Sequence, residues 1–143
     1  MISFRLEDYH EELKATVAGF ARASLQNVRL ERNLFGVRAE DRSRVAADGS
    51  VFADNTNNGV IAVSAGFGVE LNVQGSLIAN NGNNGVSSAN SGATVRLTTN
   101  IIVNNNNVGL FASGGGAILS FGNNRVAGNA GGDGAPTGTI GEQ

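Results

Sequence analysis

The sequence predicts an all-β solenoid, namely a right-handed parallel β-helix of about five coils with an N-terminal α-helical cap. Short aliphatic runs recur at a fixed interval, and asparagine and glycine recur between them at the same interval. The first 23 residues have a different, helix-like pattern. The 143-residue chain suits one domain. We divide it into a capping helix over residues 1–23, repeats over residues 24–130 and a Gly-rich tail over residues 131–143.

The landmarks of the repeat move together along the chain. Asn55 to Asn81 is 26 residues and Asn81 to Asn105 is 24 residues. Two further sets of landmarks show these same two intervals: Ser50, Ser76 and Asn100, and Gly59, Gly85 and Gly109. Because all the landmarks keep one phase, the repeats are coils of one solenoid. The period of two within short runs, with frequent Asn-Gly turns, excludes a helical repeat.

The alternation of apolar residues predicts which side chains point into the solenoid. Coils that pair in parallel lie about 4.8 Å apart, so equivalent residues stack in rows. The four expected inward rows are Val45–Leu71–Val95–Leu119, Ala47–Val73–Leu97–Phe121, Phe52–Ile78–Ile102–Val126 and Val37–Val60–Val86–Leu110.

One corner of each coil carries asparagine. The members of this column are Asn33, Asn55, Asn81, Asn105 and Asn129. Stacked amides can donate and accept along the axis, and asparagine tolerates left-handed backbone angles at a bend. We therefore interpret the column as a structural ladder, with a sugar-binding face as the alternative. A glycine column follows it at Gly36, Gly59, Gly85 and Gly109, where a positive φ or a close approach of chains is expected.

This register of inward aliphatics, an asparagine corner and an Asn-Gly-Val strand start resembles the parallel β-helix repeats of the pectin lyase-like superfamily. The resemblance covers residues 24–130. It implies a right-handed parallel β-helix, and it connects the chain with polysaccharide lyases, hydrolases and epimerases, tailspikes and adhesins. Fold-level analogy alone does not decide between these functions.

The two ends differ from the repeats. Residues Leu6, Tyr9, Leu13, Val17 and Phe20 follow helical spacing, so we predict an amphipathic helix that covers the open end of the first coil. The tail is too rich in glycine for another coil. We expect it to lie loosely over the last coil, with Ile140 as a plug.

Composition narrows the classes of partner. Charged residues make up 15% of the chain and the net charge is −2, so no basic stripe indicates a nucleic-acid partner. No apolar run is long enough to span a membrane, so we expect no membrane partner. The first eight residues lack a basic region followed by an apolar stretch, and we do not interpret them as a secretory signal. Similar β-helix proteins are often exported, and the compartment stays open.

The repeats contain few residues that could perform chemistry. There is no cysteine, and the one histidine, His10, lies in the predicted cap. Acidic residues do not stack into pairs along the axis, whereas glycoside hydrolysis needs two carboxylates at a set separation. We therefore predict no cofactor and no metal site.

The one charged cluster of the repeats lies between residues 38 and 44. Glu70 is placed one coil above Arg44, and the simplest interpretation is a cross-coil ion pair. A catalytic arginine with carboxylate partners is the sharper alternative, and its candidates are Arg44, Glu70 and Asp41.

We favour a non-catalytic structural or interaction module that binds a polysaccharide weakly, or another protein, and that could self-associate through its solenoid ends. The alternative is a polysaccharide-active enzyme of the lyase, hydrolase or epimerase kind, or a fragment of one. The shortage of carboxylates favours the first hypothesis.

Overall fold

The computed structural model describes residues 2–3 and 15–141, and within them the chain forms three parallel sheets. Sheet A has seven strands: β1 (Ile2–Ser3), β3 (Arg22–Gln26), β6 (Arg44–Asp48), β9 (Val69–Gln74), β12 (Ala93–Thr98), β15 (Ala117–Ser120) and β17 (Gly138–Thr139). Sheet B has five: β2 (Ala15–Val17), β5 (Val37–Glu40), β8 (Val60–Val63), β11 (Val86–Ala89) and β14 (Leu110–Ser113). Sheet C has five: β4 (Arg29–Glu31), β7 (Val51–Ala53), β10 (Leu77–Ala79), β13 (Ile101–Val103) and β16 (Arg125–Ala127).

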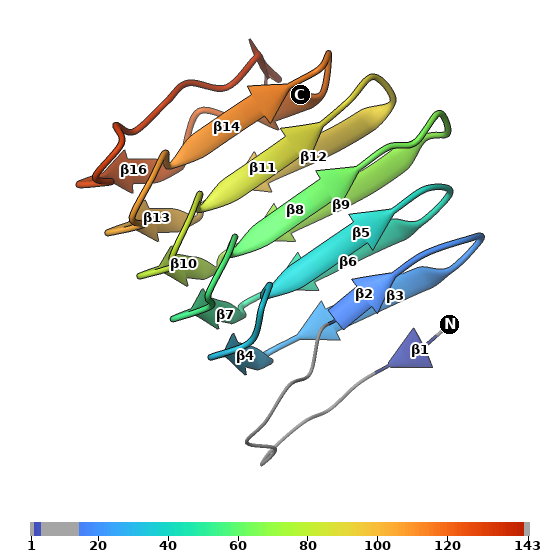
Figure 1. The fold of residues 1–143 in the computed structure, drawn as a ribbon, viewed down its shortest axis with the longest axis horizontal. Coiled ribbons are helices and arrows are strands. Elements are labelled where there is room, and N and C mark those ends of the chain that lie inside the picture. Colours follow the sequence, from blue (N-terminus) through green and yellow to red (C-terminus); the bar gives the residue numbers. More distant parts are fainter. Residues whose placement is uncertain (1, 4–14, 142–143) are drawn as a thin grey trace.

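Each coil contributes one strand to each sheet, and successive coils stack along one axis (Figure 1). Every strand pairs in parallel with its equivalent in the next coil; Val45, for example, pairs with Leu71, and Leu71 with Val95. The predicted β-helix of about five coils is confirmed. The described residues contain no helix that could cross a membrane.

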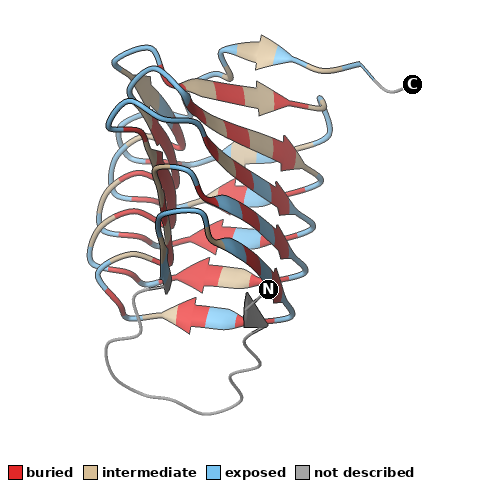
Figure 2. Cartoon of the chain, turned by 90° about the vertical axis from the view of Figure 1, so that its right-hand side faces the viewer, coloured by how far each residue is buried: buried red, intermediate tan, exposed pale blue. Residues whose placement is uncertain are grey.

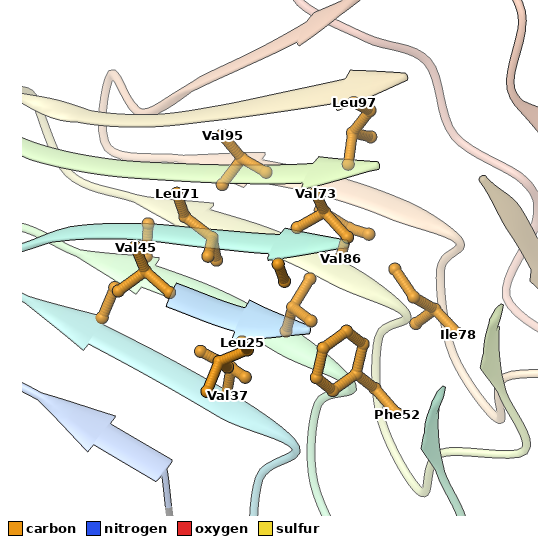
Figure 3. Packing of buried hydrophobic residues seen from close by; sticks show 14 of the residues in the cluster. Leu25, Val37, Val45, Phe52, Leu71, Val73, Ile78, Val86, Val95 and Leu97 are labelled. Carbon is orange, nitrogen blue, oxygen red and sulfur yellow. The ribbon is translucent and has the colours of Figure 1, made fainter. Parts of the chain in front are cut away.

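The core is a set of stacked apolar rows between the three sheets (Figure 3). Along the strands of sheet A, buried and exposed residues alternate, as the bands of Figure 2 show. Phe52, Ile78 and Ile102 are fully buried and stack in one row. The Val37–Val60–Val86–Leu110 row is also confirmed, because its members pair in register and are all buried.

The predicted inward rows of sheet A are wrong in the last coil. Val95 pairs with Ile118 and Leu97 pairs with Ser120, so Leu119 and Phe121 are not the inward residues. Ile118 is fully buried, whereas Phe121 is half-buried and lines the outer face. The turn from Ser113 to Ala117 is one residue shorter than its equivalent in the coil before, and the next corner is one residue longer. A shift of one residue exchanges the two faces of a strand.

The helix predicted over residues 1–23 is not found where the structure describes this segment. Ala15–Val17 is a strand paired with β5, and Arg22 begins β3. Both segments are alternating, β-branched sequences that extend the sheets of the second coil, so pairing along these edges replaces the helical pattern. Residues 4–14, with Leu6, Tyr9, Leu13 and His10, lie outside the described residues. Phe20 is 85% exposed and does not cover the core.

The Gly-rich tail continues the solenoid instead of lying loosely. The Leu110 N–H donates to the Asp133 carbonyl, and β17 pairs with β15. The Thr137 hydroxyl accepts from the Ile118 N–H at 2.9 Å, and the Ile140 N–H donates to the Ser120 carbonyl. The tail therefore supplies backbone partners to the last coil, which a bare solenoid end would lack.

Candidate functional site

The asparagine column is a continuous hydrogen-bonded ladder. The Asn81 Oδ1 accepts from the backbone N–H and the Nδ2 of Asn55, at 3.2 and 2.9 Å. The Asn81 Nδ2 donates to the Asn105 Oδ1 at 2.9 Å and to the Phe52 carbonyl at 3.1 Å. The same contacts continue from Asn105 to Asn129. Each amide thus ties one coil to both of its neighbours.

The ladder ends at an acidic residue of the tail. The Asp133 Oδ1 accepts from the backbone N–H and the Nδ2 of Asn129, at 3.2 and 2.9 Å. It takes the position that the next coil's asparagine oxygen would occupy.

Burial decides between the two interpretations of this column. All five asparagines are buried, and Asn81 and Asn105 are fully so. No buried side-chain N or O atom among the described residues lacks a partner. The column is therefore a structural ladder, because a ligand would have no free amide to reach.

The backbone at these corners differs in detail from the expectation. The left-handed angle lies one residue before each ladder asparagine, for example at Asn80 (φ 56°) and Asn104 (φ 56°). The glycine column has no positive φ at Gly59 or Gly85; there the reason is close approach. A Cβ on Gly85 would lie 2.7 Å from the Asn105 Nδ2 and 2.9 Å from the Gly109 carbonyl oxygen.

A second polar ladder was missed by the sequence reasoning. At the corner between sheets A and C, the Ser50 N–H donates to the Ser76 Oγ, and the Ser76 N–H donates to the Asn100 Oδ1. The Asn100 Nδ2 continues the ladder to the Asn124 Oδ1 at 3.0 Å. The common 26- and 24-residue intervals were the available signal, but the change from serine to asparagine hid the shared role.

The structure brings the charged candidates near one another on the surface. The Arg44 Nε lies 3.4 Å from the Glu70 Oε2, as expected for a cross-coil ion pair, and both side chains are largely exposed. The Asp41 Oδ1 accepts from the Ala65 N–H at 2.7 Å and, more weakly, from the Phe67 N–H at 3.4 Å, so Asp41 orders a turn. The Arg38 Nε donates to Glu40 at 2.5 Å. These contacts give each acidic group of the cluster a structural partner.

Among the described residues, no group of three or more His, Cys, Asp or Glu side chains could hold a metal ion. The exposed position of the Arg44–Glu70 pair also leaves both groups in water. A catalytic arginine would need a site that excludes water and orients a substrate. The geometry can therefore offer ion pairing and hydrogen bonding at this cluster.

The outer face of sheet A carries a shallow groove of about 450 Å³. Its floor is formed by outward side chains of β3, β6, β9 and β12, and Phe121 stands at one end. The polar lining residues are Ser24, Gln26, Asp48, Asn72, Gln74, Arg96 and Thr98. The Arg96 Nη1 contacts the Asn72 Oδ1 at 3.5 Å. The groove thus offers amides, hydroxyls and one guanidinium with a single carboxylate.

The sequence reasoning noted the Asp48–Gln74–Thr98 column but not the groove. The neighbouring outward column, with Asn72 and Arg96, was the available signal, because it alternates with the inward rows. The position of Phe121 could not be found, since it depends on the one-residue shift of the last coil.

Comparison with known proteins supports the architecture. The family model for the right-handed beta helix region matches residues 12–130. No curated protein matches the chain. No solved structure matches it either.

Proposed function

We propose, from the premise that this chain belongs to the family of right-handed β-helix proteins, that it is a non-catalytic interaction module. In this proposal, the groove on sheet A binds a neutral polysaccharide weakly. The observation that carries it is the double column of amide and hydroxyl side chains on a flat, exposed face.

The spacing of the groove suits an extended polymer. Coils repeat about every 4.8 Å, so a chain lying along the solenoid axis would meet a fresh pair of polar side chains at each coil. Gln26, Asp48 and Gln74 form one such column, and Phe121 offers an aromatic ring at its end. Amides and hydroxyls both donate and accept, which matches the hydroxyl groups of a sugar.

The same groove explains why we expect binding without cleavage. Asp48 is the one carboxylate that lines it. Glycoside hydrolysis uses two carboxylates about 5–9.5 Å apart, one of them as the acid. A single exposed carboxylate cannot perform both roles.

The affinity should be low. Each exposed hydrogen bond contributes about 0.5–1.5 kcal/mol net, and four of them give roughly 4 kcal/mol. A free energy of that size corresponds to a Kd of about 1 mM.

Titration of the protein with neutral hexasaccharides of cellulose, mannan and xylan, followed by NMR, tests the proposal. We expect shifts confined to sheet A, and a several-fold weaker Kd for Gln74→Ala. The matched control is Asn106→Ala, which removes an exposed amide from another corner. Absence of binding to all three sugars, or an equal loss in Asn106→Ala, would count against the groove as a binding site.

A further inference from the structure

An arginine is stacked between two exposed aromatic rings at the turns that lead from sheet B to sheet A. These turns, which join β2 to β3, β5 to β6 and β8 to β9, lie one above another along the solenoid (Figure 1). The Arg42 guanidinium carbon lies 3.7 Å from the Phe67 ring centroid and 5.0 Å from that of Phe20. Phe20 is 85% exposed and Phe67 is 50% exposed. We call Phe20, Arg42 and Phe67 the Phe–Arg–Phe stack.

The arginine of this stack stands where later coils have glycine. The register of sheet A places Arg42 in one column with Gly68, Gly92 and Gly115. Arg42 has a φ of 65°, and Gly92 and Gly115 also have positive φ. A side chain in this region is strained, and such strain is found preferentially at functional positions. Packing of the solenoid does not require the arginine, because the later coils form the same turn without it.

The stack leaves the edge of the guanidinium available. Its two faces are covered by the rings, so its N–H groups point outward in the plane, which suits a bidentate contact with a carboxylate. The nearby acids are engaged elsewhere: Asp41 accepts from backbone N–H groups, and Glu70 pairs with Arg44. No carboxylate among residues 15–141 forms an ion pair with Arg42.

A hollow of about 220 Å³ adjoins the stack. Its lining includes Gly19 and Asp41, which directly precede Phe20 and Arg42 in the chain. Ala18, Val63 and Ala65 give it small apolar walls. It is of a size to receive one apolar side chain.

We propose that the Phe–Arg–Phe stack and this hollow dock an acidic segment of a protein partner. A carboxylate of the segment binds the Arg42 edge, and a neighbouring apolar side chain enters the hollow. Arginine and phenylalanine are enriched, and lysine depleted, at the centres of protein interfaces, which matches this patch. The small apolar hollow favours a peptide over an acidic polysaccharide, whose rings carry hydroxyl groups on every side. The site lies on the turns beside sheet A and is independent of the proposed glycan groove.

Selection of a displayed library of random 12-residue peptides on the full chain tests this proposal. We expect enriched peptides with Asp or Glu next to Leu, Ile or Phe. Their binding should fall at least tenfold in Arg42→Gln and in Phe67→Ala, and should weaken with added salt. The matched control is Arg125→Gln, an exposed arginine on β16, which should bind as the parent does.

A further variant separates docking from folding. Arg42→Gly restores the glycine of the later coils, so it should melt within a few degrees of the parent while losing peptide binding. Peptide selection without an acidic motif, or unchanged binding in Arg42→Gln, would overturn the proposal. Binding of polygalacturonate oligomers in place of peptides, with the same dependence on Arg42, would also overturn it and assign the stack to an acidic glycan.

Discussion

Replacement of Asn81 with leucine removes the central amide of the asparagine ladder. Asn81 is fully buried, and its side chain makes four hydrogen bonds to the coils on either side. Leucine has a comparable volume but can neither donate nor accept. The change therefore tests the hydrogen bonds of the ladder more than its packing.

Three buried groups would lose a partner in this variant. They are the Asn55 backbone N–H, one Asn55 Nδ2 hydrogen and the Phe52 carbonyl. An unsatisfied buried polar group costs about 1–3 kcal/mol, so the loss is at least about 3 kcal/mol. Native domains are stable by about 5–15 kcal/mol, which makes this a large fraction of the total. For a domain of this size it corresponds to a fall in Tm of about 10 °C.

Thermal unfolding followed by far-UV circular dichroism measures this effect. Asn106→Leu is the control, because Asn106 is exposed in the same turn of the next coil. We expect the control to melt within about 2 °C of the parent and Asn81→Leu to melt well below it with its β spectrum retained. If the two variants melt alike, the ladder does not stabilise the solenoid and the reasoning from burial is refuted.

Three further predictions follow from the packing. Gly85→Ala should lower the stability by about 1–3 kcal/mol in denaturant titrations, because its Cβ would approach three heavy atoms closer than 3 Å, while Gly68→Ala has open space and should match the parent. Asp133→Ala should speed hydrogen exchange at the Asn129 amide, since the ladder loses its last acceptor, and equal rates would contradict this. Deletion of residues 1–21 removes β2 and exposes the edge of β5, so light scattering should report larger particles than for the full chain; a monomer would show that this edge needs no cover.

The sequence was sufficient for the repeat because its landmarks are chemically unambiguous. Asparagine at one corner and glycine at the next are demanded by a ladder and by a close approach, so their 26- and 24-residue intervals report the coil length directly. Inward rows followed wherever apolar and polar residues alternate, as in Val69–Gln74.

The last coil could not be placed by the same logic. Ala117, Ile118 and Leu119 are consecutive apolar residues, so alternation does not say which of them points inward. The answer depends on a turn that is one residue shorter, within a run of glycines that fits several lengths.

The N-terminal segment shows a second limit of pattern reasoning. Val17 and Phe20 fit a helical stripe, but Ala15–Val17 also fits a strand edge, and the structure has the strand. Sheet pairing depends on an edge that the segment's own sequence does not contain. The Phe–Arg–Phe stack was hidden for a similar reason, since it joins three different coils whose spacings are unequal.

The most direct test of the central claim is product analysis of polysaccharides after prolonged incubation with the protein. Polygalacturonate, alginate, xylan and mannan would be incubated with and without Ca²⁺, and their chain lengths would be read by mass spectrometry. A non-catalytic module leaves every chain length unchanged. New oligosaccharides that disappear in Arg44→Ala or Glu70→Ala would contradict the claim and make the exposed ion pair a catalytic site.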